Sequence, residues 1–145
     1  MTRYNKNRVL LVSFSSSIPE SIGPALEANG FEVFLTETGQ KALRTMRERL
    51  IDVIILDQQT PFDKHDASSD KFRTLEAITD ASPLLPLVLI CGRTTELSYE
   101  ASRMADIILR QPFDTPTLLD AVETVLEETL RERAHRKAGT VAILR

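Results

Sequence analysis

One acidic residue stands where reactive side chains are often found. Asp57 follows the apolar run Val53–Leu56, whose large or β-branched side chains show no alternation with polar residues. A short run of this kind predicts a strand buried on both faces, as in a parallel sheet that helices cover on each side. The carboxyl ends of such strands are where open α/β folds hold their ligand chemistry. Asp57 is therefore the first candidate for a reactive or ligand-binding group.

Four further apolar runs predict the strands that would surround this one: Val9–Val12, Phe31–Leu35, Leu87–Cys91 and Asp106–Leu109. Amphipathic segments between the runs predict helices, the first of them opening near Pro19 and closing at Asn29-Gly30. Gly23-Pro24 is expected to delay or kink that first helix, since Pro24 has no amide hydrogen to donate. Strands alternating with helices predict an α/β fold with right-handed crossovers.

The last helix is predicted to be long. Thr115 is expected to be its N-cap, Pro116 its first residue and Ala138-Gly139 its end, with apolar residues spaced three or four apart between them. The part beyond Leu130 exceeds what the core needs. Residues 1–130 are therefore predicted to form the domain, and residues 131–145 an extended final helix and tail, or a linker to an output domain or a dimer contact.

Composition narrows the class of protein. The chain has 145 residues, enough for one domain with a sizeable core, and its net charge of −3 argues against a nucleic-acid-binding surface. Its single cysteine, Cys91, cannot form an internal disulfide, which favours a reducing compartment. No apolar run is long enough to span a bilayer. A cytoplasmic protein without membrane contact is expected.

These runs together resemble the receiver domain of two-component response regulators, over about Arg8 to Leu130. The matching residues include Asp52–Asp57 with Pro61 four residues later, Thr38-Gly39, and the last strand with its cis-proline turn at Gln111-Pro112. The resemblance implies a CheY-like (βα)5 fold, a doubly wound sheet of five parallel strands in the order 2-1-3-4-5. It also implies that Asp57 takes a phosphoryl group from a histidine kinase with the help of Mg²⁺.

The chain departs from the receiver pattern at the positions that assist this reaction. The family has two acids after its first strand, a hydroxyl after its fourth and a lysine after its fifth, because phosphoryl transfer depends on positioning and charge neutralisation. Those positions hold Ser13 and Phe14, Cys91, and Gln111. The aromatic switch position holds Ile108, and the carbonyl of Gln59 is the remaining ligand expected near Asp57.

Three hypotheses follow. The leading one is a degenerate receiver, or pseudo-receiver: a protein-interaction module, not an enzyme, with no cofactor and at most weak Mg²⁺ binding. Its partners would be a histidine kinase, an output domain or another signalling protein, with a homodimer as a further option. The second is a working but atypical phosphoacceptor that uses Asp57. The third, from another class, is a sensor of small anionic ligands that binds them at the Ser13–Ser17 loop, ahead of a helix N-terminus.

Two smaller features have alternative interpretations. The polar Asp63–Lys71 loop could order over the pocket and supply metal ligands from Asp63, His65 and Asp66, although such a loop is more often only solvated. We expect no metal site there. Cys91 could sense redox state, but a cysteine that ends a buried strand more often packs as a small apolar residue.

Overall fold

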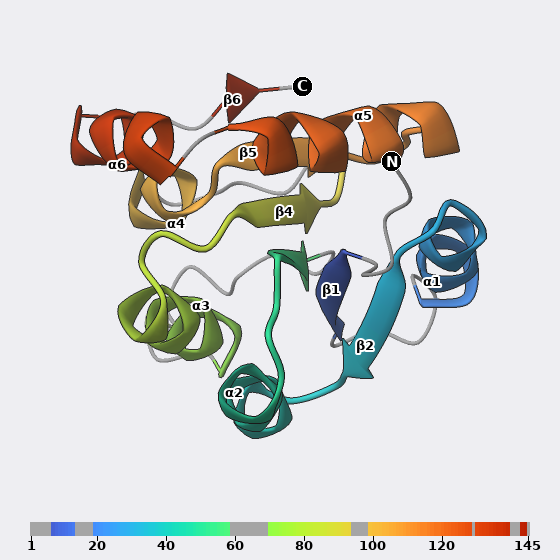
Figure 1. Cartoon of the computed structure of the whole chain (residues 1–145), viewed down its shortest axis with the longest axis horizontal. Helices are drawn as coiled ribbons and strands as arrows, with labels where there is room; N and C mark the ends of the chain where they lie inside the picture. Colours follow the sequence, from blue (N-terminus) through green and yellow to red (C-terminus); the bar gives the residue numbers. More distant parts are fainter. Residues whose placement is uncertain are drawn as a thin grey trace, which may run out of the picture.

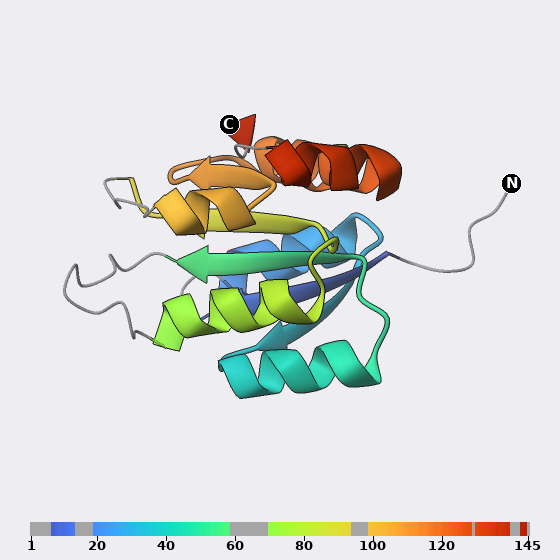
Figure 2. The ribbon, with the colours of Figure 1, turned by 90° about the vertical axis from the view of Figure 1, so that its left-hand side faces the viewer.

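A computed structural model gives the structure of the chain and describes residues 7–13, 19–58, 70–93, 99–128, 130–139 and 143–144. A parallel sheet forms its centre (Figures 1 and 2). The strands are β1 (Arg8–Ser13), β2 (Glu32–Thr36), β3 (Val53–Gln58), β4 (Leu87–Cys91), β5 (Ile107–Arg110) and β6 (Ile143–Leu144). The helices are α1 (Pro19–Ala28), α2 (Gly39–Glu48), α3 (Asp70–Ala81), α4 (Tyr99–Met104), α5 (Thr115–Glu127) and α6 (Leu130–Gly139).

The strand order is β2-β1-β3-β4-β5-β6, which confirms the predicted order of the first five strands. Alternate side chains of each strand enter different cores, as the pleat requires. Val9 and Leu11 pack in a core with α1 and α5, whereas Leu10 and Val12 pack in a core with α2 and α3. Figure 1 shows these two groups of helices on opposite sides of the sheet. Both faces are covered, which explains the unbroken apolar runs in the sequence.

Two aspartates fix the amino ends of neighbouring strands in the same way. Asp106 precedes β5; its Oδ2 accepts a hydrogen bond from the Leu87 amide at 2.6 Å, and its own amide donates to the Leu87 carbonyl at 2.8 Å. Asp52 makes the same pair of bonds with Arg8, at 2.6 and 2.9 Å. Asp106 is fully buried, whereas Asp52 is exposed. These pairs hold β4 against β5 and β1 against β3 at their first residues.

The helix ends agree in part with the sequence predictions. Gly30 has a φ of 90°, the left-handed conformation expected of a residue that closes a helix. Pro24 lies inside α1, so the expected delay of that helix was wrong. The N-cap of α5 is Asp114, not Thr115: its carboxylate accepts from the Thr117 amide at 2.9 Å and from the Thr117 hydroxyl at 2.6 Å. Asp70 and Lys71, predicted to be loop, belong to α3.

The predicted single C-terminal helix was also wrong, because the structure divides it into α5 and α6. The backbone of Glu128 is extended, with φ −67° and ψ 130°, and ends α5. The Arg133 side chain, from α6, is buried against this end and donates to the carbonyl oxygens of Val125 and Glu128 at 2.8 and 3.2 Å. After α6, β6 pairs in parallel with β5 and adds a sixth strand to the predicted five.

Gly39 marks a close approach of α2 and α3. A Cβ placed on Gly39 would clash with the Thr74 hydroxyl and lie 3.3 Å from its Cβ. We expect Gly39→Ala to lower the free energy of unfolding by about 1–3 kcal/mol, because one helix must shift. Gly23 in α1 has open space around it, so Gly23→Ala is the control and should change stability less, because the following Pro24 offsets the gain in helix propensity. Urea denaturation measures both variants, and equal effects would contradict the close approach.

Candidate functional site

The carboxyl end of the sheet brings Ser13 and Asp57 side by side. Ser13 is the last residue of β1 and stands in register with Asp57 of β3. The Ser13 hydroxyl donates to Asp57 Oδ2 at 3.0 Å, and the two residues are only 2% and 1% exposed. The Ser13 hydroxyl is a neutral donor to this buried carboxylate. This pair is the centre of the candidate site.

Cys91 ends β4, the strand next to β3. Its register partner is Gln58, the residue after Asp57, and its thiol donates weakly to the Leu109 carbonyl, with Sγ and O 3.8 Å apart. The side chain is fully buried. Burial raises the pKa of the Cys91 thiol, an effect that the charge of Arg110 partly opposes. The thiol is the neutral, poorly nucleophilic form of cysteine, which favours the packing interpretation over redox sensing.

The Cys91 thiol should therefore react slowly in the folded protein. We expect Ellman's reagent to modify it only on the timescale of unfolding, and rapidly in guanidinium chloride. Because folding raises its pKa above the unfolded value of 9.0, the stability that the protonated thiol contributes is complete below pH 9 and falls as the pH rises beyond it. Cys91→Ala should remove this contribution to the loss of stability at alkaline pH. Fast modification of the native protein would contradict the burial.

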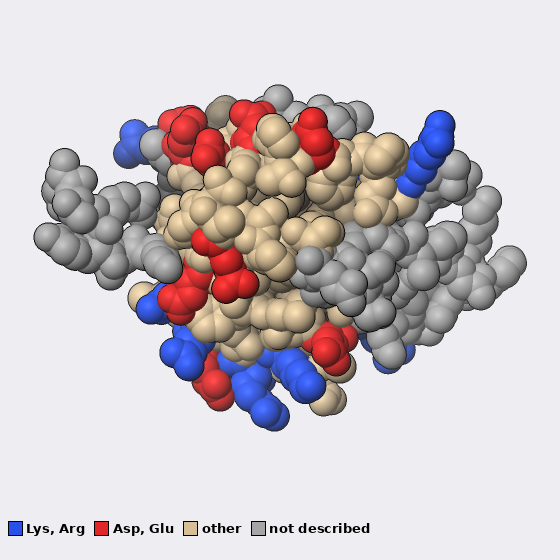
Figure 3. All heavy atoms as spheres, turned by 90° about the vertical axis from the view of Figure 1, so that its right-hand side faces the viewer, with Lys and Arg blue, Asp and Glu red and all other residues tan. Residues whose placement is uncertain are grey.

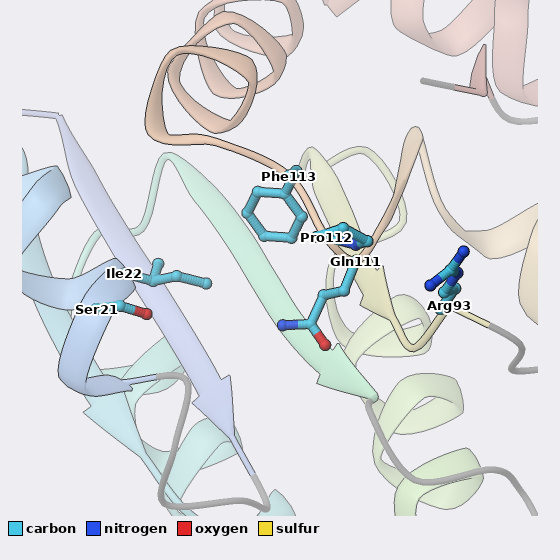
Figure 4. A pocket seen from close by; sticks show the side chains of 6 residues that line it. All are labelled: Ser21, Ile22, Arg93, Gln111, Pro112 and Phe113. Carbon is cyan, nitrogen blue, oxygen red and sulfur yellow. The ribbon is translucent and has the colours of Figure 1, made fainter.

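Gln111 follows β5 and is joined to Pro112 by a cis peptide bond, as predicted. With Phe113, these residues line an open hollow of about 460 Å³, completed by Ser21, Ile22 and Arg93. Figure 4 shows the Gln111 amide group pointing toward the end of β3, with Arg93 on the other side of the turn. Gln111 brings hydrogen-bonding capacity to this edge but no charge.

Arg93 was not singled out from the sequence. It lies two residues after Cys91, is exposed, and is the cationic side chain among the residues that line this hollow. It stands on a turn after β4 and not at the receiver lysine position after β5, so it matches no residue of the receiver pattern. The signal available was only a lone arginine after a predicted buried strand.

Ile108, at the position of the aromatic switch, is 2% exposed and packs in the core with α2, α3 and α4. Its register partners are Leu89 of β4 and Leu144 of β6, so it lies between two strands. A buried branched aliphatic side chain at this place has no polar end to expose. Ile108 therefore acts as a core residue in this conformation.

Several predicted positions lie outside the described residues. These are Phe14, Gln59, Pro61, and the loop from Asp63 with His65 and Asp66. Within the part of the chain that the structure describes, no three His, Cys, Asp or Glu side chains gather where they could hold a metal ion. In the same part, no helix is long and apolar enough to cross a membrane. Ser13 and Asp57 thus meet at this edge of the sheet, whereas the Cys91 side chain packs in the core with α2 and α3, and Gln111 lies on the adjoining turn.

The strand order, the position of Asp57 at the end of β3 and the cis peptide bond before Pro112 match the pattern of CheY-like receiver domains, the domain that response regulators use in two-component signalling. The relatives lie in the same class. The chain is 28% identical over 127 residues to an NtrX-like response regulator of Rickettsia felis, matching 86% of this chain and 26% of the relative. The chain thus spans about a quarter of that relative's length. No family model matches the sequence.

Solved structures agree on the fold. A CheY-like receiver domain from Methanospirillum hungatei has a TM-score of 0.68 at 20% identity, covering 90% of this chain and 98% of its own. A chemotaxis response regulator from Vibrio cholerae has a TM-score of 0.65 at 26% identity, covering 84% of this chain and all of its own. NtrX from Brucella abortus has a TM-score of 0.73 at 23% identity, covering 92% of this chain but 29% of its own.

Proposed function

We propose that this receiver domain is degenerate: a cytoplasmic interaction module of a signalling pathway whose phosphorylation pocket no longer works. The observation that carries the proposal is the buried Ser13–Asp57 hydrogen bond. Ser13 supplies a neutral hydroxyl at a position where receivers hold a cation-binding acid. A buried hydroxyl is a poor substitute, because Mg²⁺ requires several oxygen ligands in strict octahedral geometry and prefers carboxylates.

The opposite side of the pocket supports the same conclusion. Gln111 offers an amide where a lysine would stabilise the charge of the transferred group, and Cys91 offers a weak S–H donor where a hydroxyl would act. Removing one preorganised donor or charge commonly slows an enzymatic step by about 10²–10³-fold. A pocket without the acid, hydroxyl and lysine groups at these positions keeps the shape of a receiver without its catalytic charges. The partners of such a module are signalling proteins, a histidine kinase or an output domain, which recognise its surface.

Acetyl phosphate with Mg²⁺, followed by intact mass spectrometry, tests the proposal. The wild-type chain should gain no phosphoryl mass under conditions that fully label a competent receiver. Stoichiometric labelling that is lost in Asp57→Asn would overturn it.

A screen of nucleotides and phosphorylated metabolites by thermal shift tests the ligand-sensor hypothesis in parallel, because a specific ligand raises the melting temperature with concentration.

One observation favours the atypical phosphoacceptor as a second candidate. Arg93 places a guanidinium at the hollow that Gln111 also lines, and could replace the charge of the missing lysine. If labelling of Asp57 occurs, Arg93→Gln should reduce its rate strongly, whereas Arg103→Gln, at an exposed site on α4, should not. Equal rates in the two variants would reject this role for Arg93.

A further inference from the structure

The break between α5 and α6 has no cause in its own sequence. Residues 117–138 contain neither proline nor glycine, yet α5 ends at Glu127 and α6 begins at Leu130. In an uninterrupted helix, Glu127 would lie one turn before Arg131, an opposite-charge pair in the favourable orientation. Local sequence therefore favours one helix from Thr115 to Gly139, and a tertiary interaction must impose the break.

Arg133 supplies that interaction. Its Nη2 donates to the carbonyl oxygens of Val125 and Glu128, at 2.8 and 3.2 Å, and its Nη1 donates to the Leu84 carbonyl at 3.1 Å. Its Nε lies 3.2 Å from Glu128 Oε1 in an ion pair. In a continuous helix the Val125 carbonyl would instead accept from the amide four residues later. The guanidinium thus replaces helix hydrogen bonds at the end of α5, as basic side chains do at helix C-termini.

The broken conformation places β6 on the outer edge of β5. The pairing is short, with Ile107 opposite Ile143 and Ile108 opposite Leu144. Figure 1 shows α6 near the end of α5 and β6 next to β5. A two-residue strand adds few hydrogen bonds, each of small net value, so its position depends on the helix that precedes it. Arg133 therefore secures not only α6 but also the cover of the β5 edge.

We propose that α6 and β6 form an exchangeable strap. In the closed form, the hydrogen bonds of Arg133 keep α5 and α6 as separate helices, and β6 pairs with β5 of the same chain. In the open form residues 115–139 become one helix of about 37 Å, which carries β6 away from its own sheet. The β5 edge of a second copy offers β6 the same register, so two copies that exchange β6 regain the β5–β6 pairing of the closed form. Exchange of an identical element is a low-cost route to a dimer.

Substitution of Arg133 tests whether its hydrogen bonds keep the closed form in place. Arg133→Ala should raise the dimer association constant at least tenfold, measured by sedimentation velocity. Arg131→Ala removes the same charge from the same helix at an exposed position and should behave as the wild type. In the monomer fraction of Arg133→Ala, hydrogen exchange of the Ile108 amide, which faces β6, should accelerate, whereas that of Ile107, which faces β4, should not. A monomeric Arg133→Ala with unchanged exchange would overturn the proposal.

Two substitutions at position 129 leave Arg133 in place and keep the test informative if Arg133→Ala does not fold. Glu128 has the extended backbone that a following proline favours, and Thr129→Pro strongly disfavours the continuous helix. Thr129→Ala favours the continuous helix. We expect the alanine variant to dimerise more than the proline variant. The opposite order, or no difference, would contradict the open form.

Deletion of residues 140–145 separates exchange from other modes of association. In the Arg133→Ala background, this deletion should abolish the dimer, because β6 is the exchanged element. A dimer that survives the deletion would show association through another surface and would reject the exchange of β6. The outcome is independent of the phosphorylation experiment, since no step of the strap involves Asp57.

Discussion

Ser13→Asp should destabilise the protein strongly at neutral pH, by about 3 kcal/mol or more, because it places a second carboxylate against a buried one. The Ser13 hydroxyl lies 3.0 Å from Asp57 Oδ2, and both residues are almost fully buried. Ionising both carboxylates at this distance is energetically unfavourable. The folded variant would therefore keep a proton on the pair that the unfolded chain releases at pH 7. The destabilisation should therefore shrink as the pH falls, when the unfolded state also takes up protons.

Urea denaturation between pH 4 and 8 measures this effect, with Ser13→Asn as the matched neutral control. Mg²⁺ should restore part of the lost stability of Ser13→Asp, since a divalent cation would bridge the two carboxylates, and should leave the wild type and Ser13→Asn unchanged. Equal stabilities of the aspartate and asparagine variants, without a response to Mg²⁺, would contradict the shared pocket.

Asp106→Ala should have the second large effect, a loss of about 2–3 kcal/mol of unfolding free energy, because it leaves the buried Leu87 amide without its charged acceptor. Asp106 has no exposed surface, so water cannot reach the vacated position without disturbing the sheet. The loss falls where β4 meets β5, at the amino end of both strands. Asp106→Asn keeps an acceptor oxygen and should lose less.

The sequence offers a matched control for that experiment in Asp52→Ala. Asp52 makes the same pair of hydrogen bonds to Arg8 but is exposed, so water replaces the carboxylate and the loss should stay under about 1 kcal/mol. Equal losses in the alanine variants of Asp52 and Asp106 would show that burial does not set the size of the effect.

The fold was predictable because its signals are local. Unbroken apolar runs such as Val53–Leu56 occur where both faces of a strand are covered, and Gly30 closes a helix in the conformation that glycine adopts most easily. The placement of Ser13 near Asp57 was implied by the resemblance to receivers, whose strand order brings the carboxyl ends of these two parallel strands together. These features depend on neighbouring residues or on topology, both of which a sequence pattern carries.

The errors share a different origin. At the break after Glu127, Arg133 donates hydrogen bonds to the carbonyl groups of Val125 and Leu84, and no local pattern reports such contacts. The N-cap of α5 was displaced by one residue because Asp114 and Thr115 are both good caps, and only the bonds to Thr117 distinguish them. Arg93 was missed because its place at the hollow depends on how two turns meet.

We propose that the pocket around Asp57 cannot hold the activated state of a receiver. Beryllofluoride with Mg²⁺ tests it directly, because this complex mimics a bound phosphoryl group without any transfer step. In an ¹⁵N-resolved NMR titration, we predict that the amide signals of Ser13, Asp57, Cys91 and Gln111 stay in place up to millimolar concentrations. Saturable shifts of these signals that disappear in Asp57→Asn would contradict the claim and identify a pocket that still works.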